Sequence, residues 1–184
     1  AYFYNSFDEL LMSKTGATAM YVGIVTDTGR FRYRGVSKLT HEMAGLLVEK
    51  GADVVEIDNK LSKESIEVFR YKAHMLNSVI FDEGFVYGIV TQEDINEFGV
   101  SMEDAAAMVN LLGGIEGYDV WFLAVEYDTE IRLRIRSSSL EIDKLANLFE
   151  GGGHKMASGA RLNSFKELDK FLNETREYIK RYKR

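Results

Sequence analysis

Two short segments near the C-terminal end of the chain carry residue types that suit the binding of phosphate. The segment TEIRLRIR, residues 129–136, places an arginine at every second position, and GGGH, residues 151–154, joins a glycine run to a histidine. Arginine holds phosphate oxygens through paired hydrogen bonds. A glycine-rich turn lets backbone N–H groups converge on an anion. Together the two segments predict an anion-binding site.

The arginine-rich segment has the alternation of a strand. Because successive side chains of a strand point to opposite faces, the pattern predicts one apolar face and one basic face. The basic face would be formed by Arg132, Arg134 and Arg136. Two interpretations remain open: this face binds an anion, or it is solvated and partly neutralised by carboxylates of a neighbouring strand.

The glycine run follows a segment with a helical pattern, LEIDKLANLF, residues 140–149. In the functional interpretation, the backbone of Gly151, Gly152 and Gly153 approaches a phosphate, and His154 begins a short helix from which it donates a hydrogen bond. In the alternative interpretation the run is a helix stop followed by a loop, and His154 is merely exposed.

A third candidate lies in the first part of the chain. AMYVGIV, residues 19–25, is a continuous apolar run that predicts a buried strand of a parallel sheet, and Asp27 follows it directly. Ligands collect at the carboxyl ends of such strands, and a carboxylate there suits Mg²⁺ or Mn²⁺. A turn-capping role for Asp27 is the alternative.

The remaining pattern predicts two parts of the chain. The first contains a helix over residues 7–15 with Ser6 as its N-cap, and a helix over residues 39–51 that ends at Gly51. The polar stretch at residues 58–65 favours a boundary. The second part is expected to hold a helix-to-strand transition at 66–81, strands at 85–92, 118–128 and 129–139, and helices at 102–112, 140–149 and 164–184.

Composition limits the classes of function. The chain has 184 residues, 46% of them hydrophobic and 28% charged, which is typical of a soluble globular protein. Its net charge of −6 argues against coating nucleic acid through bulk charge, so any site for a polyanion must be local. The absence of cysteine excludes disulfides and thiolate metal sites. No run is apolar enough to span a bilayer. We expect a cytoplasmic protein with no membrane partner.

Two motifs together resemble a known family. GIVTDTGRF, residues 23–31, and GGGHKMASG, residues 151–159, resemble the DHH phosphoesterase superfamily. In that superfamily a catalytic α/β domain precedes a DHH-associated substrate domain. The spacing, and the strand that ends in Arg136 and Ser137, resemble the RecJ-like bacterial branch. Its members degrade very short RNAs and dephosphorylate 3′-phosphoadenosine 5′-phosphate.

The resemblance implies an α/β fold with a defined division. Residues 1–51 would be the end of a parallel-sheet catalytic domain, residues 52–65 a linker across which the domains close, and residues 66–184 a smaller α/β domain with a mixed sheet. Asp27 would be the catalytic and metal-binding residue, one ligand among those of two Mn²⁺ ions. The substrate-binding residues would be Arg134, Arg136, Ser137, Gly151, Gly152, Gly153 and His154.

The implied partner is a short RNA or a nucleotide, with no extended duplex DNA, and a homodimer is compatible with the sequence. Glu150 stands where the family often has a further glycine. The chain contains no Asp-His-His triplet, the element that supplies metal ligands in the family. We therefore expect the natural protein to extend upstream and this chain alone to be inactive. A cyclic dinucleotide phosphodiesterase, a RecJ-type single-strand exonuclease and a non-catalytic nucleotide-binding module remain the alternatives.

Overall fold

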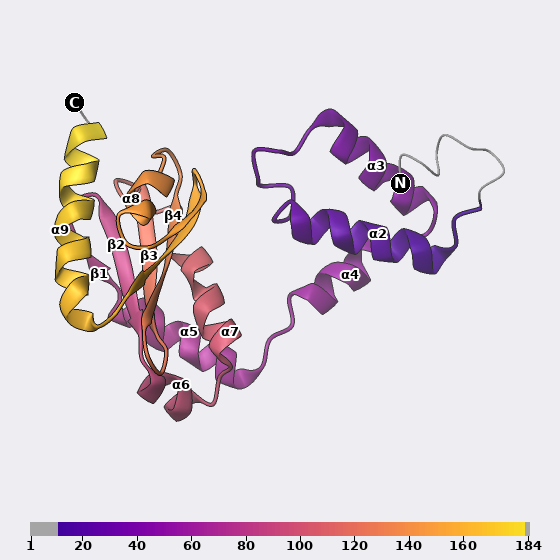
Figure 1. The fold of residues 1–184 in the computed structure, drawn as a ribbon. Helices are drawn as coiled ribbons and strands as arrows, with labels where there is room; N and C mark the ends of the chain where they lie inside the picture. Colours follow the sequence, from indigo (N-terminus) through magenta and orange to yellow (C-terminus); the bar gives the residue numbers. More distant parts are fainter. Residues whose placement is uncertain (1–10, 183–184) are drawn as a thin grey trace. The chain divides into compact units, whose positions relative to one another are not determined.

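The computed structural model describes residues 11–182, which divide into two compact units with the boundary between Lys63 and Glu64 (Figure 1). Each unit has a hydrophobic core of its own. No helix within the described residues is both long and apolar enough to cross a bilayer.

Unit 1, as far as it is described, is built from three helices: α2 (Lys14–Asp27), α3 (Lys38–Glu49) and α4 (Val54–Leu61). Each begins at a residue whose side chain accepts a hydrogen bond from the first turn, and these residues are Ser13, Ser37 and Asp53. The helix predicted to end at Gly51 is confirmed as α3, and Gly51 has a φ of 98°.

The strand predicted over residues 19–25 is wrong, because these residues lie inside α2. A short apolar run cannot by itself distinguish a buried strand from a buried helix. Here Ala17, Tyr21 and Val25 recur at every fourth position and bury one helical face against α3. The predicted N-cap Ser6, with most of the helix predicted over residues 7–15, lies outside the described residues; the N-cap of α2 is Ser13.

Residues 52–65, expected to form a linker, contain α4 and are largely part of unit 1. Arg30, in the connection between α2 and α3, pairs with Asp58 and donates to the hydroxyl of Ser62 at 3.0 Å. These contacts fasten α4 to unit 1, so the ordered structure of unit 1 extends to the boundary at Lys63.

Unit 2 is an α/β fold with a mixed six-stranded sheet in the order β1-β2-β3-β4-β6-β5. Strands β2 and β3 are parallel, and the other neighbours are antiparallel. This confirms the predicted fold class, although helix α6 was not predicted. The elements are α5 (Ile66–Ser78), β1 (Ile80–Phe81), β2 (Phe85–Val90), α6 (Gln92–Phe98), α7 (Met102–Ala107), η1 (Met108–Leu112), β3 (Val120–Glu126), β4 (Ile131–Ser137), α8 (Asp143–Asn147), β5 (Gly152–His154), β6 (Ala157–Leu162) and α9 (Phe165–Tyr182).

The two faces of the sheet are covered unequally. On one face, α8 and α9 close a core that includes residues of β2, β3, β4 and β6 (Figure 1). On the opposite face, α5, α6, α7 and η1 pack on residues of β2 and β3. The second core therefore stops at β3, and the rest of that face, on β4, β6 and β5, lies beyond it.

The position of α9 is fixed by a paired salt bridge. The guanidinium of Arg176 donates to both carboxylate oxygens of Asp82, over 3.0 Å from Nε and 2.6 Å from Nη2. Hydrogen bonding to Arg176 holds the pKa of the Asp82 carboxyl below its ordinary value. This contact joins the turn before β2 to the C-terminal helix and so closes the α9 side of the sheet.

Candidate functional site

The alternation predicted for β4 is confirmed. Ile131, Leu133 and Ile135 are buried in the core under α8 and α9, whereas the arginines point to the other face. Residues directly opposite one another on paired strands share a face. The register therefore places two rows of side chains on the arginine face: Arg134, Gly159 and Gly152 form one row, and Arg136, Ala157 and His154 form the other.

These six residues form a surface that we call the open face. Arg134 and Arg136 are half-buried, and His154 at the edge strand is exposed. Between the arginines and the edge strand, β6 contributes only Ala157 and Gly159. Since neighbouring strands lie about 4.8 Å apart, the backbones of β4 and β5 are separated by about 10 Å over this floor of small residues. We call the strip of small residues between the two arginines on one side and His154 on the other the trough.

The charges around the open face are distributed unevenly. Glu130 accepts from Arg132 at 2.6 Å and lies 3.9 Å from Arg161, so this one carboxylate partly offsets the two cations at the end of the strands beyond the trough. Hydrogen bonding to Glu130 also raises the pKa of Arg132. By contrast, Arg134 has no hydrogen-bond or ion-pair partner among the described residues. The neutralised-face interpretation therefore holds for Arg132 but not for Arg134.

The turn of the β5–β6 hairpin is anchored from outside the trough. Lys155 pairs with Glu141, and this hydrogen bond lowers the pKa of the Glu141 carboxyl. The backbone carbonyl of Lys155 accepts from the N–H of Ile142 at 2.7 Å, and that of Met156 accepts from Ser137 at 3.1 Å. The cation of Lys155 is thus engaged by Glu141, which leaves His154 as the polar side chain of the hairpin on the open face.

Two sequence expectations about this region are corrected. His154 does not begin a helix, because residues 152–154 and 157–162 form the two strands of a hairpin. Ser137 does not join the open face: its side chain is 6% exposed, and its hydroxyl accepts from the backbone N–H groups of Ser139 and Leu140 at 3.2 and 2.8 Å. Ser137 therefore stabilises the turn after β4.

The glycines of the run have different roles. A Cβ on Gly151 would overlap the carbonyl oxygen of Gly159 and lie 2.7 Å from the carbonyl oxygen of Ala146, so only glycine lets the backbone pass between α8 and β6. Gly153 has a φ of 140°, and a Cβ there would lie 2.7 Å from the carbonyl oxygen of Ala157. Gly152 has room for a Cβ. Close backbone packing, rather than a nest of N–H groups, explains Gly151 and Gly153.

Glu150, three residues after the end of helix α8, has the left-handed conformation, with a φ of 49°. After it, the N–H of Gly151 bonds back to the carbonyl of Ala146 at 3.1 Å, which closes the last turn of the helix. Glycine adopts this conformation without a Cβ penalty, and other L-residues do so at a cost. The glycine common at this position in the resembled family thus has a conformational reason, and Glu150 strains the same turn.

Asn147 borders the open face and was not among the predicted site residues. Its Oδ1 lies 3.4 Å from the position that a Cβ on Gly152 would occupy. The helical pattern of residues 140–149 could predict an exposed Asn147, but its place beside Gly152 depends on the tight turn at residues 148–151. Sequence reasoning had no signal for that turn geometry.

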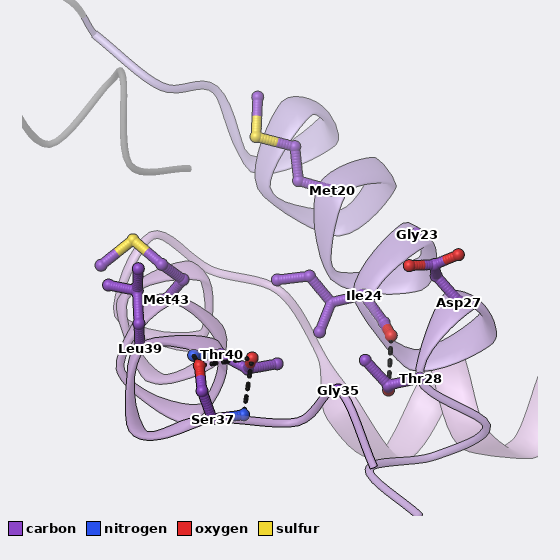
Figure 2. A pocket seen from close by; sticks show the side chains of 10 residues that line it. All are labelled: Met20, Gly23, Ile24, Asp27, Thr28, Gly35, Ser37, Leu39, Thr40 and Met43. Carbon is purple, nitrogen blue, oxygen red and sulfur yellow. Dashed lines mark hydrogen bonds between the residues drawn. The ribbon is translucent and has the colours of Figure 1, made fainter. Parts of the chain in front are cut away.

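The predicted metal ligand Asp27 belongs to the other unit. It is the exposed last residue of α2 and lines a cavity of about 590 Å³ formed by α2, α3 and the chain between them (Figure 2). The cavity wall is apolar at Met20, Ile24, Leu39 and Met43, and polar at Thr28, Ser37 and Thr40. Asp27 is the last residue of a helix and does not follow a strand, so the strand-end argument for its role is lost.

Asp27 alone does not make a metal site. Within residues 11–182 no group of three or more histidine, cysteine or acidic residues is arranged to hold a metal ion. Divalent cations such as Mn²⁺ require several oxygen or nitrogen ligands. Among the residues that line the cavity, Asp27 is the only carboxylate. The described residues therefore do not fit a complete Mn²⁺ centre.

Comparison with known proteins establishes the family. Residues 82–181 match the DHHA1 domain model, and the chain belongs to the DHHA1 domain family. The match covers β2 to α9, and thus both the arginine strand and the hairpin. It confirms the resemblance to the DHH superfamily that the two motifs predicted.

Relatives extend the similarity to most of the chain. A Bacillus subtilis protein described as "bifunctional oligoribonuclease and PAP phosphatase NrnA" is 31% identical over 172 residues, which are 93% of this chain and 55% of that protein. A Mycoplasma genitalium protein with the same description is 30% identical over 159 residues, 86% of this chain and 50% of that protein. The crystal structure of an exopolyphosphatase-related protein from Bacteroides fragilis has a TM-score of 0.82 at 25% identity, over 91% of this chain and 52% of its own. The chain thus spans about half the length of the relatives it matches.

The different roles of Gly151 and Gly152 are open to a direct test. Gly151→Ala is expected to lower the free energy of unfolding by about 3 kcal/mol, since the new methyl group must displace the backbone of α8 or β6. Gly152→Ala should change it by less than about 1 kcal/mol, because its Cβ meets only Asn147. Urea denaturation followed by circular dichroism measures both. Equal losses in the two variants would contradict the packing account.

The strain at Glu150 predicts a stabilising substitution. Glu150→Gly is expected to raise the free energy of unfolding by about 1 kcal/mol, because it removes the steric cost of the left-handed conformation. Glu150→Gln keeps the Cβ and removes only the charge, so it should stay within about 0.5 kcal/mol of the natural chain. A glutamine variant as stable as the glycine variant would show that charge, rather than conformation, is at issue.

Proposed function

We propose that unit 2 holds a short phosphorylated RNA or a nucleotide on the open face, as the binding part of a phosphoesterase. The observation that carries this proposal is the placement of Arg134 and Arg136 opposite His154 across a floor of small residues. Guanidinium groups hold phosphate oxygens in pairs of hydrogen bonds, and glycine and alanine in the floor let a ligand approach the sheet closely.

The proposed substrates are short oligoribonucleotides and 3′-phosphoadenosine 5′-phosphate. Relatives over most of this chain are described as oligoribonucleases and PAP phosphatases, which supports this class. The dimensions of the open face agree with a short ligand, because the trough is two rows long and the charge of Arg132 just beyond it is paired with Glu130. The net charge of −6 likewise favours a small local binding site over a long basic channel.

We further propose Mn²⁺ as the metal of the whole protein, with Asp27 as one of its ligands and the others supplied from outside the described residues. A bound divalent ion activates water and offsets charge on a phosphoryl group. In this division of roles, the open face binds and orients the substrate, and binding by the chain does not require the metal. The 184-residue chain alone is expected to bind its ligand without cleaving it.

The proposed phosphate contacts can be tested by calorimetric titration of the chain with a 5′-phosphorylated RNA dinucleotide. Arg134→Ala and His154→Ala should each weaken binding by about 10- to 100-fold, the worth of a hydrogen bond to a charged group. Both side chains lie outside the cores, so the stability of the fold should change little. The matched control is Arg132→Ala on the same strand, whose partner is Glu130.

Arg132→Ala is expected to weaken binding less than about threefold, since a solvated and paired charge contributes little at a distance. A loss in Arg132→Ala equal to that in Arg134→Ala would indicate bulk electrostatic attraction instead of a site. Unchanged binding in both Arg134→Ala and His154→Ala would reject the open face as the phosphate site.

The role of Asp27 requires the whole protein. Asp27→Asn is expected to lower Mn²⁺-dependent hydrolysis of the dinucleotide by about 1000-fold, because a metal contributes several kcal/mol to the transition state. Glu42→Gln on α3, an exposed carboxylate paired with Lys38, is the control and should retain activity. Full activity in Asp27→Asn would remove this residue from the metal site, and cleavage by the 184-residue chain would show that no residue outside this chain is needed.

A further inference from the structure

The far side of the open face, opposite the arginines, carries a second polar side chain besides His154. At the edge of this face, Gly152 has no side chain. The Oδ1 of Asn147 lies 3.4 Å from the position that a Cβ on Gly152 would occupy. Asn147 is the last residue of α8 and is exposed. It therefore stands beside the row that Gly152 forms with Gly159 and Arg134.

The chemistry of this side chain differs from that of the rest of the trough. An amide carries both a donor and an acceptor, and the Asn147 amide has no hydrogen-bond partner among the described residues. Leu148, the next residue, is 63% exposed and adds an apolar surface at the same end of α8. A phosphate needs donors and gains nothing from an acceptor or an apolar neighbour.

A nucleobase needs this combination. Its edge presents donors and acceptors side by side, which amide side chains match, and unstacked bases of single-stranded RNA are recognised through such contacts. The backbones of β4 and β5 lie about 10 Å apart, which leaves room for a phosphate at the arginines and a base beyond the hairpin edge. The arginine side of the trough thus suits the phosphate of a nucleotide, and the Asn147 side suits its base.

We propose that Asn147 contacts the edge of the base of a nucleotide bound on the open face, and so makes the site select nucleotides over base-free phosphate esters. The inference rests on the proposed function, and names a residue that determines specificity within it. Asn147 sets the preference for a base, and Arg134 and His154 set the affinity for phosphate.

The test compares two ligands of equal charge: a 5′-phosphorylated RNA dinucleotide and the corresponding abasic dinucleotide. The natural chain should bind the first more tightly, and in Asn147→Ala this preference should shrink by about fivefold, the worth of one hydrogen bond. Affinity for the abasic ligand should stay unchanged. Lys144→Gln, three residues earlier on α8, is the control and should keep the preference of the natural chain.

The outcomes separate this inference from the function on which it rests. If Asn147→Ala keeps the full preference for the dinucleotide while Arg134→Ala loses binding, the open face is the site and the role of Asn147 is wrong. If Asn147→Ala weakens both ligands equally, the side chain supports the turn at Gly152 rather than the base, which also overturns the inference. If neither ligand binds the natural chain, the proposed function and the role of Asn147 both fail.

Discussion

The open face depends on the close approach of three backbone segments at Gly151. There the chain leaves α8, passes against the carbonyls of Ala146 and Gly159, and turns into β5 without space for a Cβ. This packing fixes the β5–β6 hairpin on the edge of the sheet next to the arginine strand. Without it, His154 and Gly152 would not share a face with Arg134.

The two faces of the sheet are covered unequally, and this leaves the open face accessible. Helices α8 and α9 bury one face along most of its width, so the fold gains its main core there. On the other face the buried core ends at β3, with η1 also approaching β4, and β4, β6 and β5 present arginine, small residues and histidine. A net negative chain can thus carry a local positive site, because Glu130 and Glu141 pair with cations around the open face, whereas Arg134 has no ion-pair partner within residues 11–182.

The sequence predicted the parts of unit 2 that depend on periodicity. The alternation of Ile131 to Arg136 determines which side chains are buried, and period two is sufficient to assign both faces. The strand predicted at residues 19–25 was wrong, because a continuous apolar run is typical of a buried helix as well as of a buried strand. The role of the glycines also escaped prediction. Whether a glycine serves a ligand or a neighbouring backbone depends on contacts with residues such as Ala146 and Gly159, which no local pattern encodes.

The proposed placement of a nucleotide on the open face is tested most directly by mapping, in the ¹⁵N-labelled chain, which backbone amide signals shift during titration with a 5′-phosphorylated RNA dinucleotide. The account predicts saturable shifts concentrated at residues 132–136, 147–154 and 157–161. The amide signals of β2 and α5 should not shift, because these elements pack against each other in the second core. Shifts confined to the cavity of unit 1, or spread evenly over basic residues without saturation, would contradict the account.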